Sequence, residues 1–458
     1  MFKNMKKSNA ESSQLHRQFG VVTATAVVVA NMVGAGVFTS SGIMAGQLPH
    51  PLWVIACWLL GGIIAMAGAL SYAELATRMP LEGGEYIYLK RLYHPSLGFL
   101  TGWTSFFVGF SAPIALCGLG FSAYLFTTLQ HLNVLPTGAI AGQGVHTKIV
   151  AVALIAFFTL LHYVGGHVGP RVQNVLTGLK ILLIVGLVFA GMIFGKGSLT
   201  YLTQAADKPF NLMTFGTAMM MVMFSYSGWN ASAYIAGEIK NPRKTLPVSL
   251  ALGTSLVIFL YLILNLFYFY AVPYSQIKGK ITIAELALTY AFGPGMTKFF
   301  GAIIGVVLLS SLSAYIMIGP RVYYAMARDR LFFGFASLVH PRYTVPGRAI
   351  LIQGGIAILM VIAGTFEQLL IYVGFALGIF PWLAVAGLFK ARRLKIGEES
   401  AVKVWGYPVV PLFFLATNLL LMAITYFNRP EESSYAVLTI LLGIPCYFLW
   451  IKITGKKG

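Results

Sequence analysis

Apolar stretches of about 20 residues recur along the whole chain, separated by short polar segments. A membrane-spanning helix needs about 20 apolar residues in a row, whereas each strand of a membrane β-barrel has roughly ten residues that alternate between apolar and polar. The pattern therefore predicts an all-α polytopic membrane protein with about twelve transmembrane helices. The expected spans are 20–45, 51–75, 86–128, 149–166, 171–195, 212–237, 246–272, 298–326, 347–364, 367–390, 405–427 and 434–453.

Two of these spans, the first and the sixth, contain glycines and polar residues near their middle, within Asn31–Phe38 and Phe224–Asn230. An unpaired backbone amide in hydrocarbon costs several kcal/mol. A helix interrupted there must therefore give its freed N–H and C=O groups to neighbours, to water or to a ligand. Paired breaks at corresponding positions of two halves indicate the substrate site of a transporter.

The position of the breaks favours an internal repeat. Two repeats of five spans each, 20–195 and 212–390, place a break in the first span of each repeat. An odd number of crossings reverses the orientation of the second repeat, so the expected fold is a 5+5 inverted repeat with broken helices 1 and 6. The remaining parts are a cytoplasmic N-terminal tail (1–19), spans eleven and twelve (405–453) and a cytoplasmic tail (454–458).

Composition supports the membrane setting, because the chain is 58% hydrophobic and only 10% charged, with a mean hydropathy of +0.79. The net charge of +19 does not indicate a nucleic-acid partner, since most basic residues alternate between loops, which is how membrane topology is encoded. This alternation predicts that both termini face the cytoplasm and that the basic loops meet anionic lipid headgroups. We expect a multi-pass protein of the bacterial inner membrane.

Other classes of function find little support in the sequence. The three cysteines, Cys57, Cys117 and Cys446, all fall inside expected spans and indicate neither a disulfide framework nor a metal site. No nucleophile with a base, and no cluster of ligands, is evident among the spans, so we expect no enzyme and no cofactor. A channel remains an alternative, although it requires a continuous polar path rather than two focal breaks flanked by bulky aromatic residues.

Several separated motifs carry a resemblance to a known family. They are Gly34–Phe38, Pro80–Tyr88, Gly237–Pro247, Gly319–Asp329 and Val339–Pro341. Together they resemble the amino acid–polyamine–organocation (APC) superfamily, in particular its L-type and related bacterial amino acid permeases. The resemblance covers roughly residues 20–450. It implies the 5+5 fold, alternating access, and an amino acid held between broken spans one and six.

A zwitterion needs a positive end for its carboxylate and a negative end for its ammonium group, and a broken helix offers both. Gly34 and Gly36 let the backbone leave α geometry and expose amides to an anion. The expected carboxylate-binding amides belong to Ala35, Gly36 and Val37. The resemblance implies that the ammonium group meets the carbonyls of Met32, Phe224, Ser225 and Ser227. Because the family often has Ser at the position of Ala35, the backbone must bind the carboxylate here without a hydroxyl.

Two residues are expected to gate the site. The resemblance implies that the ring of Phe224 closes over bound substrate, with lipid or core packing as the alternative; Tyr226 and Trp229 share that ambiguity. Glu238, near the cytoplasmic end of span six, is a candidate for a cytoplasmic gate because its segment must move with that span.

Lys180 lies about nine residues into span five, hence roughly 14 Å deep at 1.5 Å per residue. An ionisable group at that depth is a functional candidate by default. It either exchanges a proton during transport or stays charged as a fixed substitute for a metal cation. The resemblance implies the second role, because a span-five lysine in several APC members occupies the sodium site of sodium-coupled relatives. The alternative is a lysine that snorkels to the cytoplasmic interface.

These observations predict a secondary transporter of L-amino acids that is Na⁺-independent and is either proton-coupled or an exchanger. The pocket shows no evident acidic residue, which favours neutral substrates. The alternatives are a transporter of cationic amino acids or polyamines, and a sodium-coupled symporter. Some eukaryotic relatives need a single-pass partner joined through a cysteine after span three. The stretch 129–147 contains no cysteine, so no disulfide-linked partner is expected.

Overall fold

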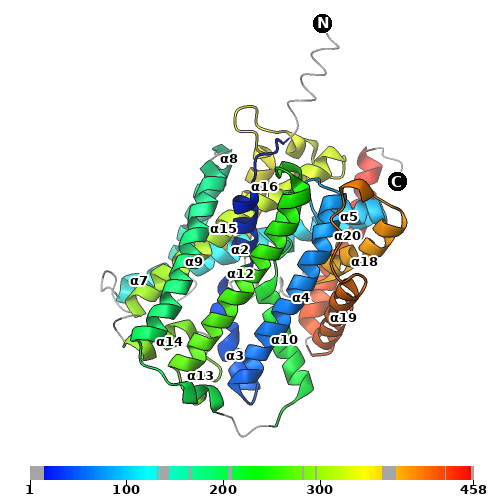
Figure 1. Cartoon of the computed structure of the whole chain (residues 1–458). Helices are drawn as coiled ribbons and strands as arrows, with labels where there is room; N and C mark the ends of the chain where they lie inside the picture. The colour runs from blue at the N-terminus through cyan, green and yellow to red at the C-terminus, as the bar shows by residue number, and fades with distance from the viewer. Residues whose placement is uncertain are drawn as a thin grey trace.

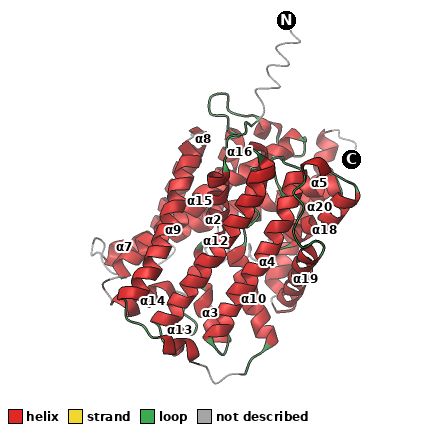
Figure 2. Cartoon of the chain, in the orientation of Figure 1, coloured by secondary structure: helices red, strands yellow, loops and turns green. Residues whose placement is uncertain are grey.

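The computed structural model describes residues 15–131, 134, 144–164, 168–204, 209–280, 283–293, 295, 297–363, 378–428 and 430–454. These residues fold almost entirely into helices (Figures 1 and 2), and their only β-type pairing is a bridge between Phe19 and Ile239. The predicted all-α class is confirmed. Apolar residues along every helix explain this choice, since only a helix satisfies its own backbone hydrogen bonds in a membrane.

The helices of the first half are α2 (Val21–Met32), η1 (Ala35–Phe38), α3 (Ser40–Gln47), α4 (Pro51–Arg78), α5 (Glu85–Leu92), α6 (Pro95–Thr104), η2 (Ser105–Ser111), α7 (Ala112–His131), α8 (Val145–Val164), α9 (Val168–Phe194) and η3 (Leu199–Thr203). Those of the second half are α10 (Leu212–Tyr226), α11 (Ala231–Tyr234), η4 (Ala236–Glu238), α12 (Pro242–Ala271), α13 (Tyr274–Ile277), α14 (Ile283–Phe292), α15 (Thr297–Arg328), η6 (Gly334–Ser337), α16 (Gly347–Ala363), α18 (Ile379–Arg393), η7 (Glu398–Ser400), α19 (Val409–Asn428) and α20 (Pro430–Thr454).

Eight helical segments of the described part are long and apolar enough to cross a membrane, and four shorter helices are also apolar. The chain is therefore an integral, multi-pass membrane protein. Within the bundle, α2 is central, because it contacts α9, α12 and α15 (Figure 1). Much of the expected tenth span (367–390) lies outside the described residues, as do residues 1–14 and 455–458 of the two expected tails and most of the stretch 129–147.

The expected third span is wrong at its start. The sequence pattern predicts one helix from residue 86, whereas the structure ends α5 at Leu92 and begins α6 at Pro95. His94 precedes a proline, a position that disfavours helical backbone. Its Nδ1 instead accepts a hydrogen bond from the N–H of Ser96 at 3.2 Å and caps α6. Consequently α5 is a separate short helix, and Glu85 stands at its first residue.

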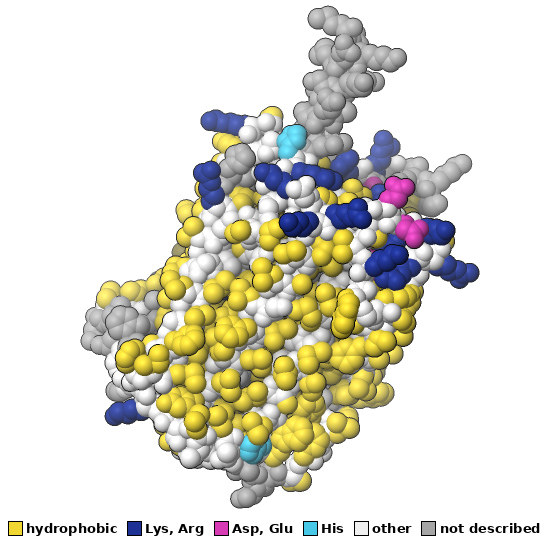
Figure 3. Space-filling view, viewed as in Figure 1, with side chains coloured by type: hydrophobic (Ala, Val, Ile, Leu, Met, Phe, Trp, Pro, Cys, Tyr) yellow, Lys and Arg dark blue, Asp and Glu magenta, His cyan; other side chains and the backbone are white. Residues whose placement is uncertain are grey.

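The surface divides into an apolar band and a basic end. Figure 3 shows hydrophobic side chains over most of the visible face, with Lys and Arg gathered at the upper end. Exposed Leu182, Phe189 and Ile193 place the outer side of α9 within the apolar band. This is the surface expected where lipid tails replace water as solvent.

Candidate functional site

The helix of the first break ends at Met32 and does not resume as an α-helix until Ser40. Between them, Val33 and Gly34 are extended and Ala35–Phe38 form one 3₁₀ turn. In such a turn the first N–H groups have no acceptor inside the turn. The N–H groups of Ala35 and Gly36, the first residues of this turn, are therefore available to a partner outside it.

The second break follows α10, which ends at Tyr226 and is separated from α11 by a four-residue turn. Gly228 in this turn has a φ of +96°, a conformation that side-chain-bearing residues rarely adopt. The glycines of the first break are different, because neither Gly34 nor Gly36 has a positive φ. The backbone does leave α geometry here, as expected, because Gly34 is extended (φ −121°, ψ −155°) and Gly36 lies in the 3₁₀ turn. These angles are open to other residues as well, so the surroundings of the two glycines give a further reason for them.

The two breaks contact each other through their glycines. A Cβ added at Gly36 would lie 2.3 Å from Ser225 Oγ, and one added at Gly228 would lie 2.9 Å from Asn31 Cβ. A glycine of each break therefore lies against a residue of the other break, too close for a larger side chain. A Cβ at Gly34 would meet no atom within 4 Å, so open space adjoins the first break beside this contact.

Tyr261, on α12, joins the two breaks directly. Its hydroxyl lies 2.6 Å from the carbonyl oxygen of Met32 and 2.8 Å from that of Ser225. Two of the four predicted ammonium-binding carbonyls thus converge on one point. Because a hydroxyl has one proton and a carbonyl oxygen has two lone pairs, each of these carbonyls retains capacity to accept another hydrogen bond.

Lys180 is fully buried and reaches the first break from α9. Its Nζ donates to the carbonyl oxygens of Val33 (2.7 Å) and Ala30 (3.4 Å) and to Ser311 Oγ on α15 (3.0 Å). The ammonium group therefore has three oxygen acceptors from two helices, and the described ion pairs contain no carboxylate for it. The side chain does not snorkel, because it is held at the break.

The aromatic residues of the second break separate into two groups. Tyr226 is buried and donates its hydroxyl to the carbonyl oxygen of Trp58 at 3.0 Å. Trp229 is also buried and packs edge-on against Tyr72 and Phe414. Phe224 and Ser227 remain partly exposed. Of the three aromatic gate candidates, only Phe224 keeps a surface that a ligand can cover.

Glu238 lies at one end of the bundle in a buried ion pair. Its carboxylate accepts from Arg321 Nε at 2.7 Å and from Gln18 Nε2 at 3.1 Å. The carbonyl oxygen of Glu238 also accepts from the N–H groups of Gln18 and Phe19. Glu238, after α11, is thereby joined to Gln18 and Phe19, before α2, and to Arg321 on α15. These contacts close this end of both broken helices.

A second buried carboxylate closes the same end on another side. Glu74 of α4 accepts from Arg78, from Arg392 of α18 at 2.6 Å and from the N–H of Val404 at 2.8 Å. Near these groups, Glu82 pairs with Arg328 at 3.1 Å. The segments tied together are those that the charge pattern assigns to one side of the membrane.

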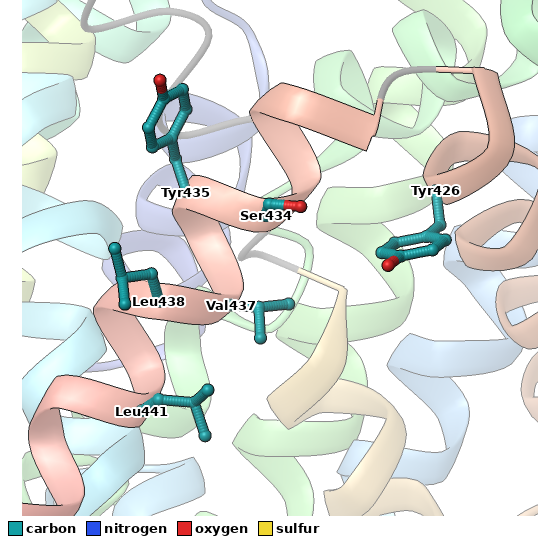
Figure 4. Close-up of a pocket in the computed structure, with 6 residues that line it drawn as sticks. All are labelled: Tyr426, Ser434, Tyr435, Val437, Leu438 and Leu441. Carbon is teal, nitrogen blue, oxygen red and sulfur yellow. The ribbon is translucent and has the colours of Figure 1, made fainter.

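A surface pocket of about 360 Å³ lies away from the breaks (Figure 4). Its lining residues come from α19 and α20: Tyr426, Ser434, Tyr435, Val437, Leu438 and Leu441. Their surface is largely apolar, and none belongs to α2, α10 or the segments between the broken helices. This pocket therefore lacks the charged or backbone groups that a zwitterion requires.

Sequence reasoning missed the hydroxyl groups that complete the site. Tyr261 and Ser311 lie in apolar spans seven and eight, and Tyr315 donates to the carbonyl oxygen of Asn31 at 3.1 Å. Their spacing along the chain does not reveal which helix faces the breaks. A polar side chain inside an expected span is the available signal, and many such residues in this chain have no role at the breaks.

Comparison with known proteins identifies the family of the chain. The amino acid permease family model matches residues 19–450. The serine/threonine exchanger SteT of Bacillus subtilis is 28% identical over 447 residues, covering 96% of this chain and 98% of SteT. The human b(0,+)-type amino acid transporter 1 is 27% identical, covering 98% and 91% of the two chains. The human Asc-type amino acid transporter 1 is 24% identical, covering 98% and 84%.

The match extends over nearly the whole chain and includes both breaks, seven of the eight long apolar segments and most of the eighth, and the residues that surround Lys180. The proteins matched are transporters and not enzymes. The chain belongs to the amino acid permease family, within the APC superfamily.

Proposed function

We propose that this protein is a secondary transporter of neutral L-amino acids that works by alternating access. The substrate carboxylate binds the amides of Ala35, Gly36 and Val37, and its ammonium group binds carbonyls of Met32, Phe224, Ser225 and Ser227. The observation that carries the proposal is the direct contact between the two breaks, at which open space beside Gly34 adjoins converging carbonyls.

The proposed architecture has twelve spans in a 5+5 inverted repeat, with spans eleven and twelve added. The reciprocal contacts of Gly36 with Ser225 and of Gly228 with Asn31 support it, because each break approaches the other in the same manner. The gathering of basic side chains at the end closed by Glu238 and Glu74 supports a cytoplasmic location for that end. Both termini then face the cytoplasm of a bacterial cell, and no disulfide-linked partner is needed.

Gating follows from the same contacts. The ring of Phe224 covers bound substrate, and the Glu238–Arg321 pair seals the cytoplasmic end until span six moves. Transport proceeds either by exchange, as the name of the Bacillus relative says of that protein, or with a proton. In liposomes, uptake that requires an internal amino acid indicates exchange, whereas uptake driven by a pH gradient indicates proton coupling.

Lys180 makes sodium unnecessary in this proposal, because its ammonium group occupies the space between α2 and α15 with a permanent set of acceptors. Replacing Na⁺ by choline is expected to leave uptake unchanged.

Lys180→Ala should lower the transport rate roughly 10- to 100-fold, since a hydrogen bond to a charged group contributes about 1.5–3 kcal/mol. The matched control is Lys148→Ala, which removes a partly buried lysine whose hydrogen bond, to the carbonyl oxygen of Ile362, lies at the surface. Sodium-dependent uptake, or an unimpaired Lys180→Ala variant, would overturn this assignment.

The test of the proposed function is thermal stabilisation of purified protein by each amino acid, followed by counterflow in liposomes. A ligand that binds the native state raises its melting temperature. Stabilisation by neutral amino acids with saturable counterflow is expected. Stabilisation only by cationic amino acids or polyamines would show that the substrates are cationic and not neutral. Flux that never saturates would indicate a channel.

A further inference from the structure

A buried carboxyl group, for which the described residues provide no counter-ion, lies beside the second break. Glu85, the first residue of α5, is 4% exposed. One of its carboxyl oxygens, Oε1, accepts from Tyr72 of α4 at 2.8 Å and from Asn230 Nδ2 at 2.5 Å. Tyr234 of α11 also hydrogen-bonds this carboxyl. All three donors are neutral. Asn230 is the last residue of the second break, and Tyr234 lies in α11, which follows it.

Among the described residues, the charged groups of neighbouring elements that form ion pairs form them with partners other than Glu85. Arg78 and Arg392 bind Glu74, Arg328 binds Glu82, Arg321 binds Glu238 and Lys90 binds Asp329. The titratable groups that face Glu85 are the phenols of Tyr72, Tyr88 and Tyr234. Tyr88 has a buried hydroxyl for which the described residues provide no hydrogen-bond partner.

We propose that Glu85 is a proton-binding site that senses whether the segment after the second break is in place. Here the carboxyl group is buried and shielded from water, and the Glu238 and Glu74 ion pairs close one end of the bundle. When α11 moves and water enters from that end, the O–H bond of the carboxylic acid breaks. The proton passes to water and the carboxylate is hydrated. The inference rests on the alternating-access function proposed above.

Electrostatics agrees with this geometry. Burial raises the pKa of Glu85 to about 7, against the hydrogen bonds from Tyr72, Tyr234 and Asn230, which lower it. In water a glutamate has a pKa of about 4.3. The closed form therefore binds the proton more tightly than a hydrated form. Lower pH favours the closed form, and this preference is lost as pH rises through about 7.

The proton itself is observable without transport, as the carboxylic acid C=O stretch in infrared spectra of the purified protein. We expect a band that titrates near pH 7 in the wild type, that is absent in Glu85→Gln and that persists in the control Glu285→Gln. Glutamine keeps the shape and the accepting oxygen of the protonated group. Persistence of the same band in Glu85→Gln, or a wild-type carboxyl that titrates only near 4.3, would overturn the proposal.

A second variant tests the site independently of Glu85→Gln. Tyr72→Phe removes one donor to Oε1 and keeps the ring, so the midpoint of the band should move to higher pH by about one unit. An unchanged midpoint would contradict the assigned geometry.

The link to movement is tested with spin labels at two exposed lysines, Lys240 just before α12 and Lys395 just after α18. The wild type should shift toward the longer distance between pH 6 and 8, about one unit on either side of the midpoint, whereas Glu85→Gln should keep one distribution. A wild-type distribution that does not respond to pH would refute the link. Thermal stabilisation by amino acids, measured on the same preparations, tests the proposed function separately.

Discussion

Gly34→Val is expected to abolish amino acid binding while leaving the empty protein folded. A Cβ at this position meets no atom within 4 Å, and the extended backbone (φ −121°, ψ −155°) accepts a β-branched residue. The added side chain therefore fills the space proposed for the substrate without a clash. Affinity should fall at least about 100-fold, or about 2.7 kcal/mol, as measured by the amino-acid dependence of the melting temperature.

The control for this variant is Gly186→Val on the exposed side of α9, where an added Cβ also meets nothing within 4 Å. It should bind like the wild type. Gly36→Val is a poorer test, because its Cβ would lie 2.3 Å from Ser225 Oγ and disturb the empty protein as well. Normal affinity in Gly34→Val would show that the open space at the first break is not the substrate site.

Arg321→Met is expected to cause the largest loss of stability. It leaves the Glu238 carboxylate, which is fully buried, without its counter-ion. Removing one partner of a buried ion pair typically costs about 3–5 kcal/mol, because the remaining charge stays desolvated. The melting temperature should fall clearly, and labelling reagents should reach the end of the bundle that this ion pair closes more readily.

Two comparisons separate this effect from general damage. Arg321→Met combined with Glu238→Gln should recover much of the lost stability, since no charge is then left buried and unpaired. Arg328→Met should have little effect, about 1 kcal/mol or less, because the Arg328 side chain is 44% exposed in its pair with Glu82. Equal losses in Arg321→Met and Arg328→Met would contradict a buried gate.

Much of the fold is predictable from hydrophobic pattern alone, because a membrane helix is specified by length and apolar content. Helix α15 runs from Thr297 to Arg328 where the pattern predicts 298–326. The pattern did not predict the division between α5 and α6, which depends on local backbone geometry at His94-Pro95 and not on hydrophobicity. It also did not separate α13 and α14, two short helices before α15, from the connecting loop.

The candidate site is predictable in part. Glycines and polar residues at mid-span located both breaks, and depth alone singled out Lys180. The partners of Lys180 were not predictable, because Ser311 and the carbonyl oxygen of Val33 come from helices whose rotation the sequence does not specify. Glu85 escaped notice for a similar reason. Its position beside a loop does not reveal that it is buried, with its carboxyl group hydrogen-bonded to Tyr72 of α4 and Tyr234 of α11.

The most direct test of the central claim is an experimental structure of the protein with an L-amino acid bound. The account predicts density beside Gly34, with the carboxylate on the amides of Ala35–Val37 and the ammonium group within hydrogen-bond distance of carbonyls in Phe224–Ser227. Density in another place, such as the pocket between α19 and α20, with the space at the two breaks still empty, would contradict it.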